Sequence, residues 1–165
     1  MRHLRSALSE VNVLLMDNQN NDSRFVFAQF CDDIRQEIGQ KFSLMGCYGS
    51  EMIIDKLPAS LPKLGILVKI FTGTDRPFSH LLVRALMNDE ILAELEIPVA
   101  KSADAFQKIA STTDLGRVGL QAILVLSPLV VVEPCKIRIE AETEEGIIRG
   151  SYIKLRQRTP EDPPL

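Results

Sequence analysis

The chain has 165 residues, of which 45% are hydrophobic and 25% are charged, a composition typical of one folded globular domain and not of a disordered chain. Its 19 basic and 22 acidic residues give a net charge of -3. The basic residues are scattered along the chain, which argues against nucleic acid as a partner because nucleic-acid binding requires a basic patch. The densest basic stretch, Lys154, Arg156 and Arg158, has a period of two and predicts the solvated face of a terminal strand.

Residues 1–23 are predicted to form an N-terminal extension with a short amphipathic helix and a linker. Apolar residues recur in it at a helical spacing: Leu4, Leu8, Val11 and Leu15. The polar stretch DNQNNDS, residues 17–23, is typical of a linker. Two interpretations remain open: a frayed extension, or a helix that docks on a sheet or on a second subunit.

From Phe25 onward the apolar pattern alternates as in β-strands. Residues 25–31 and 41–47 predict two strands joined by the turn DDIRQEIGQ, in which Gly39 supplies a positive φ. A third short strand is expected at 51–55. The prolines of KLPASLP, residues 56–62, predict a crossing loop because two prolines do not fit in a central ladder.

The next strand is predicted at 64–71. Residues 80–87 and 90–97 predict a hairpin, because Asn88 and Asp89 between them tolerate the left-handed conformation of a tight turn. In 90–97 one face is expected to enter the core while a mostly acidic face meets water. The expected core residues of this strand are Ile91, Ala93, Leu95 and Ile97.

Residues 98–116 predict a long loop with a turn or two of helix capped by Ser102. Three further strands are expected at 117–126, 135–142 and 147–157, the last two joined by the turn TEEG. The tail 159–165 carries three prolines and is expected to be extended or unstructured.

These elements predict an all-β fold, a two-sheet antiparallel β-sandwich of the immunoglobulin-like or C2-like kind, with about eight strands over residues 24–158 and a short N-terminal helix. The apolar run Val118–Val132 suggests that both faces of its strand are covered, since Ile123 and Val125 stand where a one-sided strand carries polar residues. The N-terminal helix, the long loop or another subunit would supply the cover.

The three cysteines, Cys31, Cys47 and Cys135, are odd in number and contain no Cys-x-x-Cys pair, which predicts reduced thiols and not a disulfide framework or a zinc site. The N-terminus lacks the features of a secretory leader. The longest apolar run, residues 122–132, is about half the length of a membrane-spanning helix. A cytoplasmic protein with no membrane association is therefore expected.

The stretch FCDDIRQEIGQKFSLMGCYG, residues 30–49, is the main candidate for a site. A metal or nucleophile site would use Cys31, Asp32, Asp33 and Glu37, with His80 as the base that an activated cysteine needs. Turn formation explains the same residues more simply, and no phosphate-binding glycine pattern is present. No catalytic, cofactor-binding or metal-binding residue is assigned, and no cofactor is expected.

Two segments resemble a bacterial protein family of uncharacterised function. The first, residues 25–64, has an acidic, arginine-containing turn, a K-x-S-L-x-G-x-Y strand and an LP…LPKL crossing; the second, residues 130–155, is similar to that family's closing hairpin. The residues of the first segment that carry the resemblance are Asp33, Arg35, Glu37, Lys41, Ser43, Leu44, Gly46, Tyr48, Leu57, Pro58, Leu61, Pro62, Lys63 and Leu64. The resemblance covers about residues 25–157 and implies one small sandwich-like domain, with no activity and no functional residues.

The leading functional hypothesis is a non-catalytic protein-interaction or structural module with a protein partner or a homo-oligomeric state. The alternatives are an enzyme or metal-binding protein that uses the Cys31–Glu37 turn together with His80, and a small-ligand carrier. A carrier requires an apolar cavity between the sheets.

Overall fold

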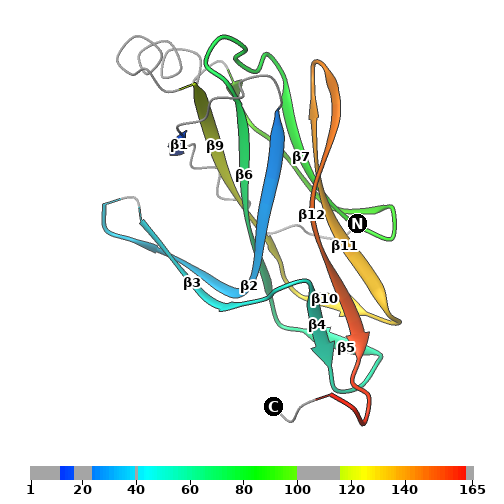
Figure 1. The fold of residues 1–165 in the computed structure, drawn as a ribbon. Helices are drawn as coiled ribbons and strands as arrows, with labels where there is room; N and C mark the ends of the chain where they lie inside the picture. The colour runs from blue at the N-terminus through cyan, green and yellow to red at the C-terminus, as the bar shows by residue number, and fades with distance from the viewer. Residues whose placement is uncertain (1–11, 17–23, 40, 100–115, 163–165) are drawn as a thin grey trace.

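The fold is known from a computed structural model that describes residues 12–16, 24–39, 41–99 and 116–162, the first range by its strand alone. The described residues form twelve strands, and nearly all of their secondary structure is β (Figure 1). The predicted all-β class with antiparallel sheets is confirmed. The expected number of about eight strands is too low, partly because two strands of only three residues were not predicted. One lies in the expected crossing loop at 56–62, and the other lies between the predicted strands 117–126 and 135–142.

The first sheet has five strands in the order β1-β9-β6-β2-β3, and all its pairings are antiparallel. Its strands are β1 (Asn12–Met16), β2 (Phe25–Glu37), β3 (Lys41–Cys47), β6 (Leu64–Gly73) and β9 (Arg117–Leu126). The strands β6 and β9 are paired over their whole lengths and lie in the middle of the sheet.

The second sheet also has five strands, in the order β4-β12-β11-β7-β8. Only β4 and β12 pair in parallel; the other pairs are antiparallel. Its strands are β4 (Glu51–Ile54), β7 (Leu81–Met87), β8 (Glu90–Glu96), β11 (Cys135–Thr143) and β12 (Gly146–Gln157). A small third sheet pairs β5 (Ala59–Leu61) with β10 (Leu129–Val131).

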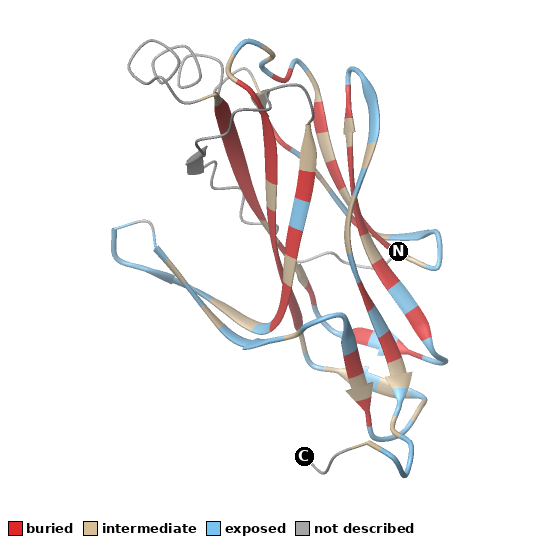
Figure 2. Ribbon diagram, in the orientation of Figure 1, coloured by how far each residue is buried: buried red, intermediate tan, exposed pale blue. Residues whose placement is uncertain are grey.

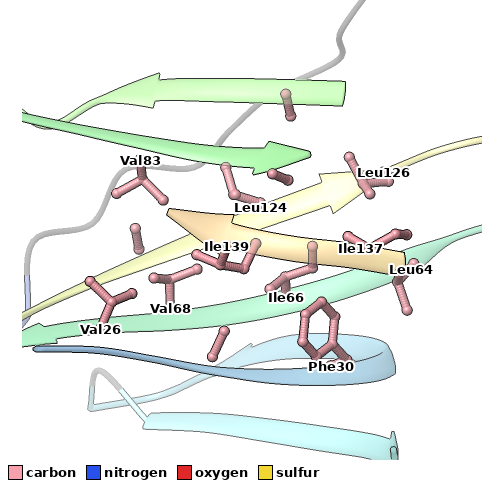
Figure 3. Close-up of a cluster of buried hydrophobic side chains, with 14 of the residues drawn as sticks. Val26, Phe30, Leu64, Ile66, Val68, Val83, Leu124, Leu126, Ile137 and Ile139 are labelled. Carbon is pink, nitrogen blue, oxygen red and sulfur yellow. The ribbon is translucent and has the colours of Figure 1, made fainter. Parts of the chain in front are cut away.

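Both five-stranded sheets contribute to one cluster of buried hydrophobic side chains. Figure 3 shows Ile66 and Val68 of the first sheet in one cluster with Ile137 and Ile139 of the second. All four side chains are 0% exposed. In Figure 2 the buried residues, coloured red, lie mainly along the strands of the two large sheets. Burial of branched aliphatic side chains from two sheets is the main source of stability in such a fold.

The predicted N-terminal helix is wrong for Asn12–Met16, which form strand β1 and pair with β9 from Gln121 to Arg117. The helical spacing of Leu4, Leu8, Val11 and Leu15 is a weak signal because it rests on four apolar residues only. Pairing with an apolar neighbour strand overrides it. Residues 1–11 and the predicted linker at 17–23 lie outside the described part of the chain.

The predicted turn DDIRQEIGQ is also too long. Strand β2 continues through Glu37, and the chain turns at Ile38 and Gly39, where Gly39 has a φ of 79°. The aspartates that were interpreted as turn residues are therefore strand residues. The expected hairpin at Asn88 and Asp89 is confirmed, with φ values of 47° and 78°.

Strand β8 follows the predicted alternation in part. Ala93 is 2% exposed and Ile97, just beyond the strand, also 2%, but Ile91 is 55% exposed. The register shifts between Ala85 and Leu86 of the neighbouring strand, and such a bulge turns a side chain away from its expected face. Strand β9 is buried or half-buried throughout, as its apolar run predicts. The short helix predicted after Ser102 lies outside the described residues.

The tail is more ordered than expected up to Asp162. Its carboxylate accepts two hydrogen bonds from the guanidinium of Arg156, both at 2.7 Å, and the backbone N–H of Thr159 also donates to it at 2.7 Å. Of the predicted basic strand face, Lys154 and Arg156 lie in the last strand, whereas Arg158 follows its end. Arg156 also meets Glu51. The remaining residues 163–165 lie outside the described range.

Candidate functional site

The most unusual feature of the fold is a two-stranded arm formed by residues 32–47, called here the hairpin arm. Strand β2 pairs with β6 from Phe25 to Cys31. Cys31 pairs with β3 as well, and from Asp33 to Glu37 the partner of β2 among the described strands is β3 alone. In Figure 1 the hairpin arm extends away from both sheets, and in Figure 2 it is mostly exposed. The sequence explains the change of partner, because polar residues replace the apolar ones of β2 at Asp32 and Asp33.

The two faces of the hairpin arm differ in chemistry. On one face Ile34 lies opposite Leu44 and Gln36 lies opposite Phe42, and the three apolar side chains are half-buried. The other face carries the pairs Asp33–Met45, Arg35–Ser43 and Glu37–Lys41. At the tip, Ile38 is 94% exposed.

Hydrogen bonds fix the base of the hairpin arm to the body. The hydroxyl of Tyr48 donates to Asp32, and the ammonium of Lys63 donates to Asp33. The hydrogen bond from Lys63 holds the pKa of Asp33 below its ordinary value. Burial, followed by the hydrogen bond to Asp32, raises the pKa of Tyr48. Asp32 and Asp33 are thus acceptors in a structural network.

Gly46 and Gly65 allow the close packing of this base. A Cβ atom at Gly46 would lie 1.9 Å from Oδ2 of Asp32, and the φ of Gly46 is 63°. A Cβ atom at Gly65 would lie 3.0 Å from Cγ1 of Ile34 and 3.3 Å from Sγ of Cys31. Small residues at both positions let the strands cross where β2 changes its partner.

The two cysteines of this region lie opposite each other at the base of the hairpin arm. Cys31 pairs with Cys47 in the ladder; Cys31 is buried and Cys47 is exposed, and both are free thiols. Burial is the main reason that the pKa of the Cys31 thiol rises to about 11, and Cys47, Asp32 and Asp33 add to this, whereas Lys63 opposes it. Cys31 is therefore a poor nucleophile near neutral pH.

The structure does not bring His80 to these cysteines. The Nε2 atom of His80 lies 3.6 Å from Glu142, and its backbone N–H donates to Glu144. Glu37, the remaining predicted site residue, accepts a hydrogen bond from Ser43 at 2.9 Å. Cys31, Asp32 and Asp33 are thus neighbours, but the histidine lies at another position in the fold. Among the described residues, no three His, Cys, Asp or Glu side chains come together as metal ligands would.

A second polar cluster joins the start of β2 to the tip of the β11–β12 hairpin. Arg24 donates to Glu144 at 2.6 Å and to Thr72 at 3.1 Å, and its guanidinium lies 4.5 Å from the centre of the Phe78 ring. Glu144 also accepts from the backbone of Ser79 and His80. The acidic tip is anchored by an arginine side chain that is 5% exposed.

Three hollows in the described surface are open to solvent. One lies at the tip of the hairpin arm and is lined by Glu37, Ile38, Lys41, Phe42 and Ser43. Another lies beside Tyr48 and β4, and the third lies beside Arg24 and Gly146. None of these three is an enclosed space between the sheets of the kind that a small-ligand carrier needs.

Comparison of the chain with models of known protein families, with curated proteins and with solved structures finds no match. Among the described residues, no helix is both long enough and apolar enough to cross a membrane. The site therefore has to be interpreted from its own geometry.

Sequence reasoning missed the opposition of Cys31 and Cys47 and the roles of Tyr48 and Lys63. A signal for the cysteines was present: both lie at the same distance along the chain from Gly39, the residue at the turn. A hairpin centred on that glycine pairs residues equally distant from it. The contacts of Tyr48 and Lys63 carried no comparable signal, because they depend on how β2 crosses from one partner strand to the other.

Proposed function

We propose that the protein is a non-catalytic interaction module of the bacterial cytoplasm, a β-sandwich of the immunoglobulin-like or C2-like kind, and that it pairs with a second copy of itself through the hairpin arm. The observation that carries this proposal is the projecting arm with its free edge and exposed tip. Two five-stranded sheets that share one core support the sandwich class.

The outer edge of β3 is suited to pairing with another strand. It is the last strand of its sheet and has no partner on that side among the described strands. Natural proteins usually protect such an edge with charges, prolines or bulges. In β3 there is no proline, and Lys41 is the only charged residue. Addition of a strand to an open edge is a common mode of protein recognition.

A second copy fits this edge because the strand is complementary to itself. An antiparallel pair of β3 strands with its two-fold axis at Ser43 sets Phe42 opposite Leu44 of the second copy, and the same contact forms twice. Aromatic and aliphatic residues opposite each other are favourable cross-strand pairs. Lys41 then lies opposite Met45 of the second copy, so no like charges of β3 face each other.

Association is tested with the full chain by native mass spectrometry and by light scattering during size-exclusion chromatography, from low micromolar to several hundred micromolar protein. We expect a dimer whose fraction rises with concentration. Val130→Lys is the control, because Val130 is an exposed apolar residue of β10, 56% exposed, outside the hairpin arm. This substitution should leave the dimer unchanged, whereas a wild-type chain that is monomeric at every concentration contradicts the proposal.

Charge substitutions at Ser43 test the pairing itself. Ser43→Arg and Ser43→Glu each set two like charges opposite each other at the axis, and we expect each variant alone to be monomeric, with dimerisation weakened at least about tenfold. An equal mixture of the two variants should form a mixed dimer again. Such recovery cannot arise from misfolding. Dimers that persist in both single variants would show that another surface holds the copies together.

A further inference from the structure

Cys31 and Cys47 have the backbone geometry of a cross-strand disulfide. They are directly opposed partners in the β2–β3 ladder, and opposed residues of an antiparallel pair have Cα atoms about 4.5 to 5.5 Å apart. Disulfides form when the Cα atoms are about 4.4 to 6.8 Å apart. The two residues also share one face of the ladder, because opposed side chains point to the same side of a sheet. The bond can therefore form by rotation of the two side chains, without rearrangement of the backbone.

The environment supports contact between the two sulfur atoms. Sγ of Cys31 lies 3.6 Å from the carbonyl oxygen of Gly65, and the absence of a side chain at Gly65 leaves room beside the sulfur. Cys47 is exposed and belongs to the edge strand β3. One cysteine of the pair is thus exposed to solution, and the other is its opposed partner in the ladder.

We propose that Cys31 and Cys47 form a reversible redox site, in which a low-molecular-weight disulfide of the glutathione type oxidises the thiol pair to an intramolecular disulfide. This inference does not depend on self-association of the hairpin arm. It assigns different roles to the two cysteines, since Cys47 reacts first and Cys31 resolves the intermediate.

The reaction has two thiol–disulfide exchanges. In the first, the Cys47 thiolate attacks one sulfur of the small disulfide; a bond forms to Cys47, the original S–S bond breaks, and one small thiolate leaves. In the second, the Cys31 thiolate attacks Sγ of Cys47 and displaces the second small thiolate. The two protons lost by the cysteines are taken up by the two leaving thiolates. Two electrons pass from the protein to the small disulfide, which is reduced to two thiols.

The second exchange is the slow one. Among the described residues, Cys47, Asp32 and Asp33 raise the pKa of Cys31 and Lys63 lowers it; burial has the largest effect. The hydroxyl of Tyr48 also interacts electrostatically with the Cys31 thiol. With a pKa of about 11 the thiolate of Cys31 is scarce at neutral pH, and only the thiolate attacks. The mixed disulfide on Cys47 should therefore accumulate first and resolve faster as the pH rises towards this value.

The new bond would close the hairpin arm at its base. Backbone pairing now holds β2 and β3 together where β2 leaves β6. A covalent link at this point prevents the two strands from separating and limits the ways in which the hairpin arm can move relative to the body. Reduction by an excess of thiol restores the open pair, because a thiolate in solution can attack the exposed Cys47 sulfur and excess thiol drives the exchange towards the reduced pair.

The test incubates the reduced full-length protein with oxidised glutathione near pH 8 and follows intact mass and cysteine-containing peptides with time. We expect a glutathione adduct on Cys47, then loss of the adduct and a final mass lower by two hydrogen atoms, with a peptide that links Cys31 to Cys47. Dithiothreitol should reverse the change. Cys135→Ser is the control and should oxidise as the wild type does, because Cys135 is buried away from the pair.

Two variants separate the roles of the cysteines. Cys31→Ser should stop at the glutathione adduct, and Cys47→Ser should show neither the adduct nor the linked peptide. If Cys31→Ser fails to fold, the wild-type time course still tests the order of the two steps. The glutathione adduct on Cys47 has to appear before the peptide that links Cys31 to Cys47. A wild-type protein that keeps the adduct on Cys47 indefinitely, or that links Cys47 of two copies instead, overturns the proposal.

Discussion

The guanidinium of Arg24 donates to the carboxylate of Glu144 at 2.6 Å, joining residues that are 120 positions apart in the chain. The arginine side chain is 5% exposed and the glutamate side chain 30%. The same guanidinium group donates to the hydroxyl of Thr72 and packs on the Phe78 ring. This contact holds the start of β2, the end of β6 and the β11–β12 tip together.

Replacing Arg24 by methionine should destabilise the fold by about 2 to 3 kcal/mol, because a hydrogen-bonded and largely buried charge is lost while Glu144 stays behind. Methionine keeps most of the apolar volume over Phe78. The free energy of unfolding is measured by urea denaturation. The control is Arg149→Ala, since the side chain of Arg149 is 79% exposed and lies 3.6 Å from Glu140; a change below about 0.5 kcal/mol is expected there. An equal decrease in the free energy of unfolding in the two variants would contradict the anchoring role of Arg24.

The stability of the fold should decrease in acid because of Glu144. Burial alone would raise the pKa of this carboxyl, but the hydrogen bond from Arg24, together with backbone donors that include His80 and Ser79, lowers it to about 2 from an ordinary value of 4.5. A carboxyl whose pKa is lowered on folding stabilises the folded state fully above the unfolded pKa, and this stability is lost as the pH falls through the folded pKa. The loss is therefore expected between about pH 4.5 and pH 2.

Glu144→Gln tests this dependence on pH. The glutamine variant should be less stable than the wild type at pH 7, and the difference should shrink as the pH falls from 4.5 to 2, because protonated Glu144 resembles glutamine. Some acid dependence should remain in the variant, since the pKa values of Asp33 and Asp162 are also lowered. Unfolding curves at several pH values measure the difference, and a difference that stays constant with pH contradicts this explanation.

Much of the fold could be predicted from the sequence, because two-residue alternation and turn residues act locally. The hairpin at Asn88 and Asp89 depends on residues that tolerate positive φ, and both have it. The misjudged elements depend on partners that are distant in the chain. Asn12–Met16 is a strand because β9 offers an edge, and Asp32–Glu37 continue β2 because β3 pairs with them.

The candidate site was predictable only in part, for a related reason. Cys31, Asp32 and Asp33 are neighbours in sequence and remain neighbours in the structure, but a role for any of them depends on which groups arrive from elsewhere. Lys63 reaches Asp33 from the crossing segment before β6, whereas His80 turns towards Glu142. Contacts between side chains of distant segments carry no periodic signal in a single sequence.

Gly46→Ala should loosen the hairpin arm. The added methyl group would meet Asp32 at 1.9 Å in a backbone conformation with a φ of 63°, which side chains rarely adopt, and the combined cost should be about 2 kcal/mol. Asp32 has to move and lose its hydrogen bond with Tyr48. Hydrogen exchange should become faster for the amides of β3 and the second half of β2. At Gly49 a methyl group meets nothing within 4 Å, and Gly49→Ala should leave exchange unchanged.

The two large sheets approach each other closely at Gly150 of β12, so a side chain at this position should destabilise the fold. A Cβ atom there would lie 2.8 Å from Cγ1 of Val26 in β2 and 3.2 Å from the carbonyl oxygen of Ile139. Nearby, the backbone N–H of Ala28 donates to the hydroxyl of Ser151 at 3.0 Å, so the two strands cannot separate without loss of that bond. Gly150→Ala should therefore cost about 1 to 3 kcal/mol through overpacking.

A double-mutant cycle shows whether the contact with Val26 is the cause. Val26 is 8% exposed, and Val26→Ala alone should cost about 2 kcal/mol because it leaves a small cavity. In the double variant the methyl group at position 150 occupies part of that space, so the combined cost should be smaller than the sum by about 1 kcal/mol. Val130→Ala, at an exposed position of β10, should instead add to Gly150→Ala without coupling. If the costs of Gly150→Ala and Val26→Ala simply add, the contact with Val26 is not the cause of the destabilisation. The cause would then be the contact with the backbone carbonyl of Ile139, which no side-chain truncation can relieve.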